Sequence, residues 1–215
     1  MIAPLDSLGW LWAVCAVLLQ TAGFLVIIAG IRRATAHPNP FSWLIWSLVA
    51  SLAAAGSWRA GATWPLGGAL ANALGCMAVL VVTLGRGGFV ANRVDLSCLA
   101  VAAVGIVAWS WTSDPVIGLA LFLAADAAGA VPTIRTVALD GRSKSVTGWA
   151  LLALAGMAAV CSVEPRQWAW TWAGFGQWGG AVYVAAVNAL VTATIMLARA
   201  TRPSVRRQAT GAIVG

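Results

Sequence analysis

The chain has 215 residues, of which 61% are hydrophobic and only 9% are charged. A soluble globular domain carries about 25% charged residues, so this composition excludes a soluble domain and indicates an integral membrane protein. The formal net charge is +7, but the basic residues lie between apolar runs rather than in one segment, which argues against nucleic-acid binding.

Seven apolar runs approach the length of a membrane span, which takes roughly 20 residues at about 1.5 Å each. The residues before the first run contain no Lys or Arg, and that run is too long for a cleaved signal segment, so we expect it to be a true span. The predicted helices cover residues 9–31, 41–58, 64–84, 94–112, 115–134, 146–163 and 174–198.

The basic residues are unequally divided between the two sides of these runs. Eleven lie on the side that holds the loops after the first, third and fifth runs and the C-terminal tail, whereas only Arg59 and Arg166 lie on the other. Because short cytoplasmic loops retain Lys and Arg, the N-terminus is predicted outside and the C-terminus in the cytoplasm. Together with the excess of Arg over Lys, this favours a protein of a bacterial cytoplasmic membrane.

A weak internal repeat relates residues 20–43 to residues 126–149, an offset of 106. In this register Gln20 falls on Asp126 and Trp43 falls on Trp149. A unit of three helices starts and ends on opposite sides of the membrane, so one extra helix between two such units makes them parallel. The sequence therefore predicts an all-α membrane protein of seven transmembrane helices, a 3+1+3 bundle with two parallel triple-helix repeats. Its parts are the first repeat (1–86), a linker helix (87–113), the second repeat (114–199) and a basic cytoplasmic tail (200–215).

The second copy contains the segment VPTIRTVALDGRSKSVTGW, residues 131–149. Here a run that contains Pro132 leads through a basic loop, residues 135–144, to Ser-x-x-x-Trp at the start of the next run. This pattern resembles the PQ-loop superfamily, which includes the SWEET and SemiSWEET sugar transporters and the cystinosin-type carriers. Pro132-Thr133 stands in place of the family's Pro-Gln, whereas Val26 stands where the first copy should have Pro. The resemblance implies a solute site between the halves that opens alternately to each side, with Pro132 helping its helix to bend.

Asp126 is the strongest candidate for a functional residue. It lies about eleven residues into the fifth run, close to the bilayer midplane. A carboxylate there costs roughly 2.5–3.5 kcal/mol on insertion scales, so we expect it to face the bundle interior and to bind solute or exchange protons. The alternative is a neutral Asp that is hydrogen-bonded to a neighbouring helix for packing alone. Asp95, in contrast, opens the fourth run, where an acid complements a helix N-terminus.

Three amide side chains complete the predicted solute site. Gln20 is the counterpart of Asp126, and by itself it would join two helices with about 0.6 kcal/mol. SWEET-like carriers place a solute-binding Asn on the third helix of each half, and Asn72 and Asn188 lie on those helices, with interhelical packing as the alternative. Tyr183 precedes Asn188 by about one and a half turns. It could reach the same cavity, but we expect its ring to pack.

The sequence contains no Gly-rich phosphate loop and no nucleophile–His–acid set, and its four cysteines lie in apolar runs without paired spacing. We therefore expect no enzyme, no cofactor and no metal site. The first hypothesis is a carrier or facilitator for a sugar or another small polar metabolite, working by alternating access and coupled to protons if Asp126 titrates. The second is a non-transporting membrane subunit of the same fold, acting as an assembly or regulatory partner. The expected partners are membrane lipid, a small polar solute and protons, and a second copy of the chain is left open.

Overall fold

The structure is a computed structural model that describes residues 9–59, 64–87, 91–112, 115–140, 145–163 and 172–201. These residues form seven α-helices and contain no β-strand. Five helices (α1, α3, α4, α5 and α7) are long and apolar enough to cross a membrane, and the apolar parts of α2 and α6 are shorter. The helices are α1 (Gly9–Arg32), α2 (Pro40–Arg59), α3 (Trp64–Leu84), α4 (Arg93–Trp111), α5 (Pro115–Asp140), α6 (Val146–Cys161) and α7 (Trp172–Ala200).

The predicted runs agree with these helices to within two residues at every end but one. Helix α5 continues to Asp140, six residues past its predicted end, so Arg135 lies on a helix and not in a loop. Pro132 is buried inside α5, and the helix continues beyond it, as transmembrane helices allow when neighbouring groups bond the freed backbone. Arg142, Lys144 and the tail after residue 201 lie outside the described residues.

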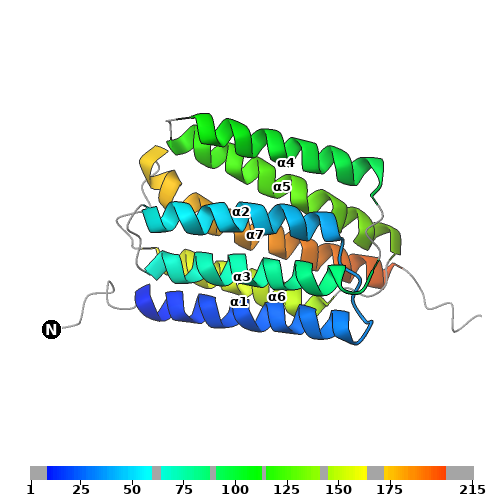
Figure 1. Ribbon diagram of the computed structural model, residues 1–215. Coiled ribbons are helices and arrows are strands. Elements are labelled where there is room, and N and C mark those ends of the chain that lie inside the picture. Colours follow the sequence, from blue (N-terminus) through cyan, green and yellow to red (C-terminus); the bar gives the residue numbers. More distant parts are fainter. Residues whose placement is uncertain are drawn as a thin grey trace, which may run out of the picture.

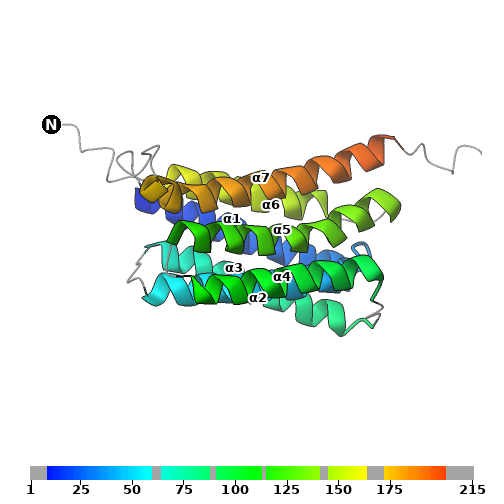
Figure 2. The ribbon, with the colours of Figure 1, turned by 90° about the horizontal axis from the view of Figure 1, so that it is seen from above.

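The helices lie side by side along one common direction, with their connections at the two ends (Figures 1 and 2). Helix α3 packs on both α1 and α2, and α7 packs on both α5 and α6. Two further pairs, α1 with α6 and α2 with α5, join these groups, while α4 packs on α5 and α2. Below, the contacts of α1 with α6 are called the α1–α6 seam, and those of α2 with α5 the α2–α5 seam.

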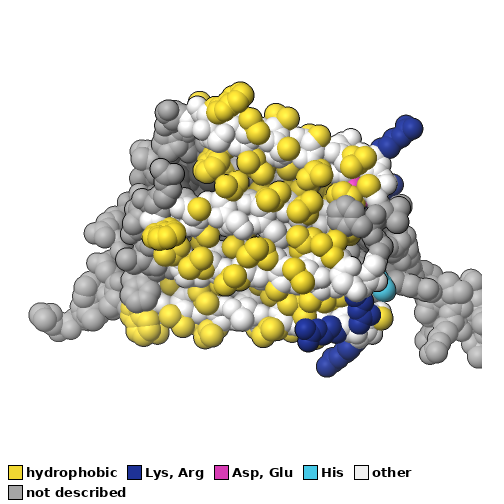
Figure 3. Space-filling model, viewed as in Figure 1, with side chains coloured by type: hydrophobic (Ala, Val, Ile, Leu, Met, Phe, Trp, Pro, Cys, Tyr) yellow, Lys and Arg dark blue, Asp and Glu magenta, His cyan; other side chains and the backbone are white. Residues whose placement is uncertain are grey.

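The outer surface of the bundle is apolar between its two ends (Figure 3). Large apolar side chains such as Leu18, Leu25 and Val104 are more than 60% exposed, as expected of helices that face lipid. Exposed basic side chains gather at one end, as Figure 3 shows. Tryptophans at the opposite ends of α1, α2 and α4 are exposed, which matches the headgroup level that indole rings prefer. They are Trp10, Trp12, Trp58 and Trp111.

At the basic end, a hydrogen-bonded network joins the starts of α2 and α4. Asp95 completes a capping box with Asn92, which confirms the cap position predicted for this acid. Its other oxygen accepts a hydrogen bond of 3.0 Å from Asn39 Nδ2, while Asn39 Oδ1 accepts one of 2.8 Å from the backbone N–H of Phe41. One Asn–Asp contact therefore holds the N-terminal ends of two helices together.

The packing of α6 on α7 gives the first prediction. A Cβ added at Gly156 would lie 2.7 Å from the backbone N and Cα of Ala185, whereas one added at Gly180 meets nothing within 4 Å. Because a backbone cannot yield as a side-chain tip does, Gly156→Ala should destabilise the protein by about 1–3 kcal/mol. Gly180→Ala is the matched control and should leave stability unchanged or raise it by up to about 1 kcal/mol. Thermal unfolding in detergent measures both, and equal melting temperatures would contradict the close approach of α6 and α7.

Candidate functional site

The carboxylate of Asp126 faces another helix of the bundle. Its Oδ2 accepts a hydrogen bond of 3.0 Å from the hydroxyl of Tyr183 on α7, and the Asp126 side chain is only partly exposed. Tyr183, which the sequence favoured as a packing residue, is thus the donor to the acid. Because a polar group inside a bilayer must find its partner within the protein, this bond links α5 to α7.

The corresponding pair in the first half consists of Gln20 and Asn72. Gln20 Nε2 on α1 donates a hydrogen bond of 2.8 Å to Asn72 Oδ1 on α3. One turn further along α3, Cys76 Sγ lies 3.8 Å from the same oxygen and within electrostatic range of the Asp126 carboxylate. The structure therefore brings three of the four predicted site residues toward one region, as two pairs.

Asn188 is the predicted site residue that does not join these pairs. Its Nδ2 donates a hydrogen bond of 2.8 Å to the backbone oxygen of Val184, one turn earlier on α7. At 3.6 residues per turn, Asn188 points roughly 140° away from Tyr183 around the helix. The two side chains therefore do not share a cavity, and the rotation of α7 directs Tyr183 toward α5.

Helix α2 is bonded to α5 on both sides of Pro132. Before Pro132, Trp46 Nε1 donates a hydrogen bond of 3.1 Å to the backbone oxygen of Asp126. After it, Thr133 Oγ1 donates one of 2.9 Å to Ser42 Oγ, and both hydroxyls are buried. A bond to a main-chain oxygen has no signal in the sequence, so Trp46 could not be identified from the residues alone.

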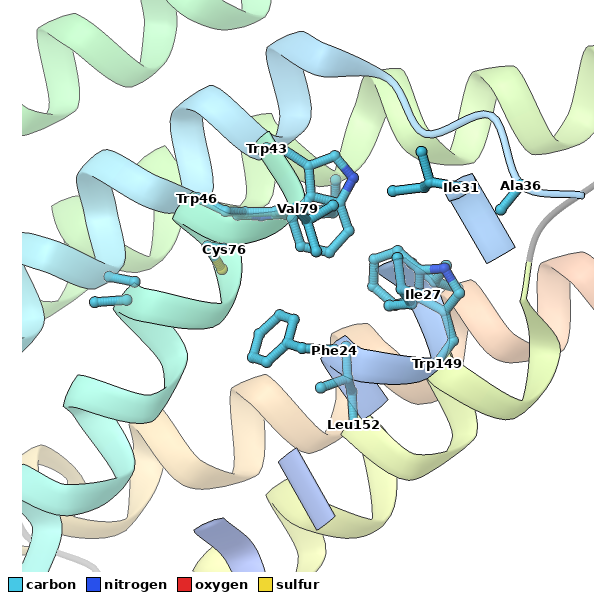
Figure 4. Packing of buried hydrophobic residues seen from close by; sticks show 14 of the residues in the cluster. Phe24, Ile27, Ile31, Ala36, Trp43, Trp46, Cys76, Val79, Trp149 and Leu152 are labelled. Carbon is cyan, nitrogen blue, oxygen red and sulfur yellow. The ribbon is translucent and has the colours of Figure 1, made fainter. Parts of the chain in front are cut away.

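Three tryptophans pack together where the two halves meet near the basic end (Figure 4). The rings of Trp43 and Trp149 are 5.7 Å apart between centroids, and Trp46 contacts both at 5.2 Å and 5.7 Å. Phe24 meets Trp43 edge-on at 6.2 Å. Trp43 and Trp149 are the two residues that the internal repeat equates, and they touch each other directly.

A small cavity lies beside these rings. Its volume is about 10 Å³, near the minimum that one water molecule needs and too small for an organic solute. Trp43 Nε1 is buried nearby and has no hydrogen-bond partner among the described residues. Asp126 is not among the side chains that line the cavity, which are Ile27, Ala36, Pro38, Trp43, Thr133, Ser145 and Trp149.

The offset of 106 also relates contacts across the two seams. A Cβ on Gly23 would lie 2.9 Å from the side chain of Leu152, and one on Gly129 would lie 2.8 Å from that of Trp46. Gly23 corresponds to Gly129, and Trp46 corresponds to Leu152. Each seam therefore places a large side chain from one half over a glycine of the other.

A second contact repeats in the same way. Gly148 lies against Ile27, because a Cβ there would come within 2.6 Å of Ile27 Cγ1. The corresponding residues in the other seam are Ser42 and Thr133, which are hydrogen-bonded to each other. The N-terminal caps of α2 and α6 also correspond. Asn39 Oδ1 accepts a hydrogen bond from the backbone N–H of Ser42, and Ser145 Oγ accepts one from the backbone N–H of Gly148.

Comparison of the chain with protein-family models, with curated proteins and with solved structures finds no match. Within the described residues, no group of His, Cys, Asp and Glu side chains is arranged to hold a metal ion. The arguments about function below therefore rest on the geometry of this chain.

The bond between Tyr183 and Asp126 gives the second prediction. A double-mutant cycle with Tyr183→Phe and Asp126→Leu, which has no acceptor, should give a coupling energy of about 0.6–1.7 kcal/mol, the range for hydrogen bonds between transmembrane helices. The matched control combines Tyr183→Phe with Gln20→Leu, which belong to different pairs and should add within about 0.5 kcal/mol. Unfolding in mixed micelles measures all variants. Additive effects of the first two substitutions would show that the bond contributes nothing.

Proposed function

We propose that the protein is a carrier or facilitator for a small polar solute, working by alternating access between two triple-helix halves. The observation that carries this proposal is a pair of hydrogen-bonded contacts, one in each half, whose members Gln20 and Asp126 are equated by the repeat. Gln20 bonds Asn72 in one half, and Asp126 bonds Tyr183 in the other. Polar groups are costly inside a bilayer and mark the paths of ions and solutes, so two such pairs at one level favour a binding site between the halves.

The helix contacts support the 3+1+3 arrangement on which this mechanism depends. Exchanging α1, α2 and α3 for α5, α6 and α7 turns the packed pairs α1–α3, α2–α3 and α1–α6 into α5–α7, α6–α7 and α5–α2. All six pairs occur, and the remaining packed pairs involve α4. Two parallel repeats joined by a linker helix account for this pattern, as in the PQ-loop carriers that the sequence resembles.

The proposed solute site consists of Asp126, Gln20 and Asn72, and Tyr183 replaces Asn188 as its fourth residue. An acid that accepts one hydrogen bond has further lone pairs for a solute hydroxyl or amine, and it can also take up a proton. The amide pair offers both donors and acceptors. A sugar or another small metabolite rich in hydrogen-bonding groups fits this set better than an apolar solute does.

The conformation is closed at the basic end, which we assign to the cytoplasm of a bacterial cell. There the rings of Trp43 and Trp149 meet between the halves, and the adjoining cavity of about 10 Å³ does not admit a solute. Pro132 lies in α5 at this level, where the missing N–H removes one backbone hydrogen bond and eases bending. Opening toward the cytoplasm requires the cavity beside the two tryptophans to widen.

Solute flux tests the proposal. Purified protein in liposomes should take up radiolabelled glucose or alanine faster than protein-free liposomes do, and an inward proton gradient should accelerate uptake. Asp126→Asn should abolish the acceleration by the gradient, because the amide cannot exchange a proton, while it retains exchange without a gradient. Asp95→Asn is the matched control, since Asp95 is buried at a helix cap and does not belong to the proposed solute site.

Two outcomes separate the hypotheses. A gradient response that persists in Asp126→Asn would remove proton coupling and leave the carrier. No uptake across a wider panel of sugars, amino acids and polyols would instead favour a non-transporting membrane subunit. The small cavity at the closed end, which Asp126 does not line, is the feature that favours this second candidate.

A further inference from the structure

The two seams that join the halves are built from different chemistry. In the α1–α6 seam, Gly23 and Gly148 face each other, because a Cβ on either would lie 3.0–3.2 Å from the other's backbone oxygen. Side chains of Leu152 and Ile27 fill the adjoining space. Small residues let the two backbones approach closely, so van der Waals contact holds this seam.

The cytoplasmic end of the α2–α5 seam, beyond Pro132, uses a hydrogen bond at the same register. Ser42 and Thr133 stand where the other seam has Gly148 and Ile27, and their hydroxyls are bonded at 2.9 Å. Before Pro132 this seam is packed as the other one is, because Ile45 and Trp46 lie against Gly129.

This difference has a consequence when a water-filled path opens between the halves. A hydrogen bond between two protein groups contributes only about 0.5–1.5 kcal/mol net, because water can replace either partner. Separating two closely packed apolar surfaces instead loses their dispersion contacts and exposes them to water. The hydrogen-bonded end of the α2–α5 seam is therefore easier to open than the α1–α6 seam.

Helix α5 is also the helix that can bend at this level. Pro132 has no N–H, so the backbone oxygen of Ala128 lacks its usual helical donor. The equivalent residue of α1 is Val26, which retains its N–H. Bending at Pro132 moves the end of α5 that contains Thr133.

The buried apolar residues of α5 that pack with α4 lie before Pro132. Gly105 of α4 lies against Ala125 of α5, before Pro132. The cytoplasmic end of α4 is bonded to α2 instead, through Asp95 and Asn39. These contacts keep α2, α4 and the first part of α5 together while the segment after Pro132 swings.

We propose that the two seams have unequal roles, a statement that rests on the carrier function proposed above. The α1–α6 seam is a fixed pivot, and the cytoplasmic end of the α2–α5 seam, beyond Pro132, is the part that opens. The movement of the halves is therefore asymmetric despite the internal repeat.

Thiol reactivity tests this without requiring transport. In a background without the four native cysteines, Thr133→Cys and Leu152→Cys place one buried thiol in each seam, at positions that are 1% and 6% exposed. Leu152 packs on Gly23 in the α1–α6 seam and does not line the cavity that Thr133 lines. A charged, membrane-impermeant methanethiosulfonate reagent is added to the cytoplasmic side of everted vesicles. Thr133→Cys should react at least about tenfold faster, because only its seam opens to water. Equal rates, or a faster reaction of Leu152→Cys, would overturn the proposal, and complete labelling in SDS controls for thiol content.

Disulfide locks test the consequence for transport. Ser42→Cys with Thr133→Cys closes the α2–α5 seam, and Ile27→Cys with Gly148→Cys closes the α1–α6 seam. After oxidation with copper phenanthroline, the first lock should lower glucose or alanine uptake by more than about tenfold, reversibly with reductant, because the open state is removed from the equilibrium. The second lock should leave uptake within about twofold, and loss of uptake there would overturn the pivot.

The two experiments separate the failure of this inference from failure of the carrier proposal. If the unlocked protein moves no solute, the carrier proposal fails, and the two thiol rates still decide whether the seams differ. If it moves solute but both locks stop it, the carrier stands and the asymmetric movement is wrong. The thiol comparison also does not depend on the crowded Gly148 variant.

Discussion

Inside a lipid bilayer, a polar group must find its hydrogen-bond partner within the protein, and the organisation of this bundle follows from that requirement. Asp126 is supplied with a donor by Tyr183, and Gln20 is supplied with an acceptor by Asn72. The first bond ties α5 to α7, and the second ties α1 to α3. Helices α2 and α6 contain the shorter apolar segments, and they pack on α5 and α1 across the two seams.

The two seams show how one register can support two kinds of interface. At one level Gly148 meets Ile27, and at the corresponding level Ser42 meets Thr133. The same backbone spacing accommodates either pair, because each pair has one small member, Gly148 or Ser42. At this level one interface is held by packing and the other by a hydrogen bond that water can replace.

The helices were predictable because apolar length and basic flanks fix where a chain enters and leaves a membrane. The end of α5 was missed because the basic residues from Arg135 on suggested a loop, whereas the helix continues to Asp140. The partner of Asp126 was missed for another reason. Choosing between Tyr183 and Asn188 requires the rotation of α7 about its axis, which packing sets and an apolar sequence does not encode. The bond from Trp46 to a backbone oxygen likewise left no trace in the sequence.

For the carrier proposed above, the indole N–H of Trp43, which has no partner among the described residues, bears on the balance between its two conformations. A buried donor without a partner costs about 1–3 kcal/mol, and in the proposed cycle this cost falls on the closed state, in which Trp43 is 1% exposed. Opening the α2–α5 seam breaks the bond between Thr133 and Ser42, a loss of about 0.5–1.5 kcal/mol, but it lets water or solute reach the indole. The two terms have opposite signs and similar size. They therefore bring the closed and open states closer in energy, and a carrier that alternates between two conformations needs them to differ by only a few kcal/mol.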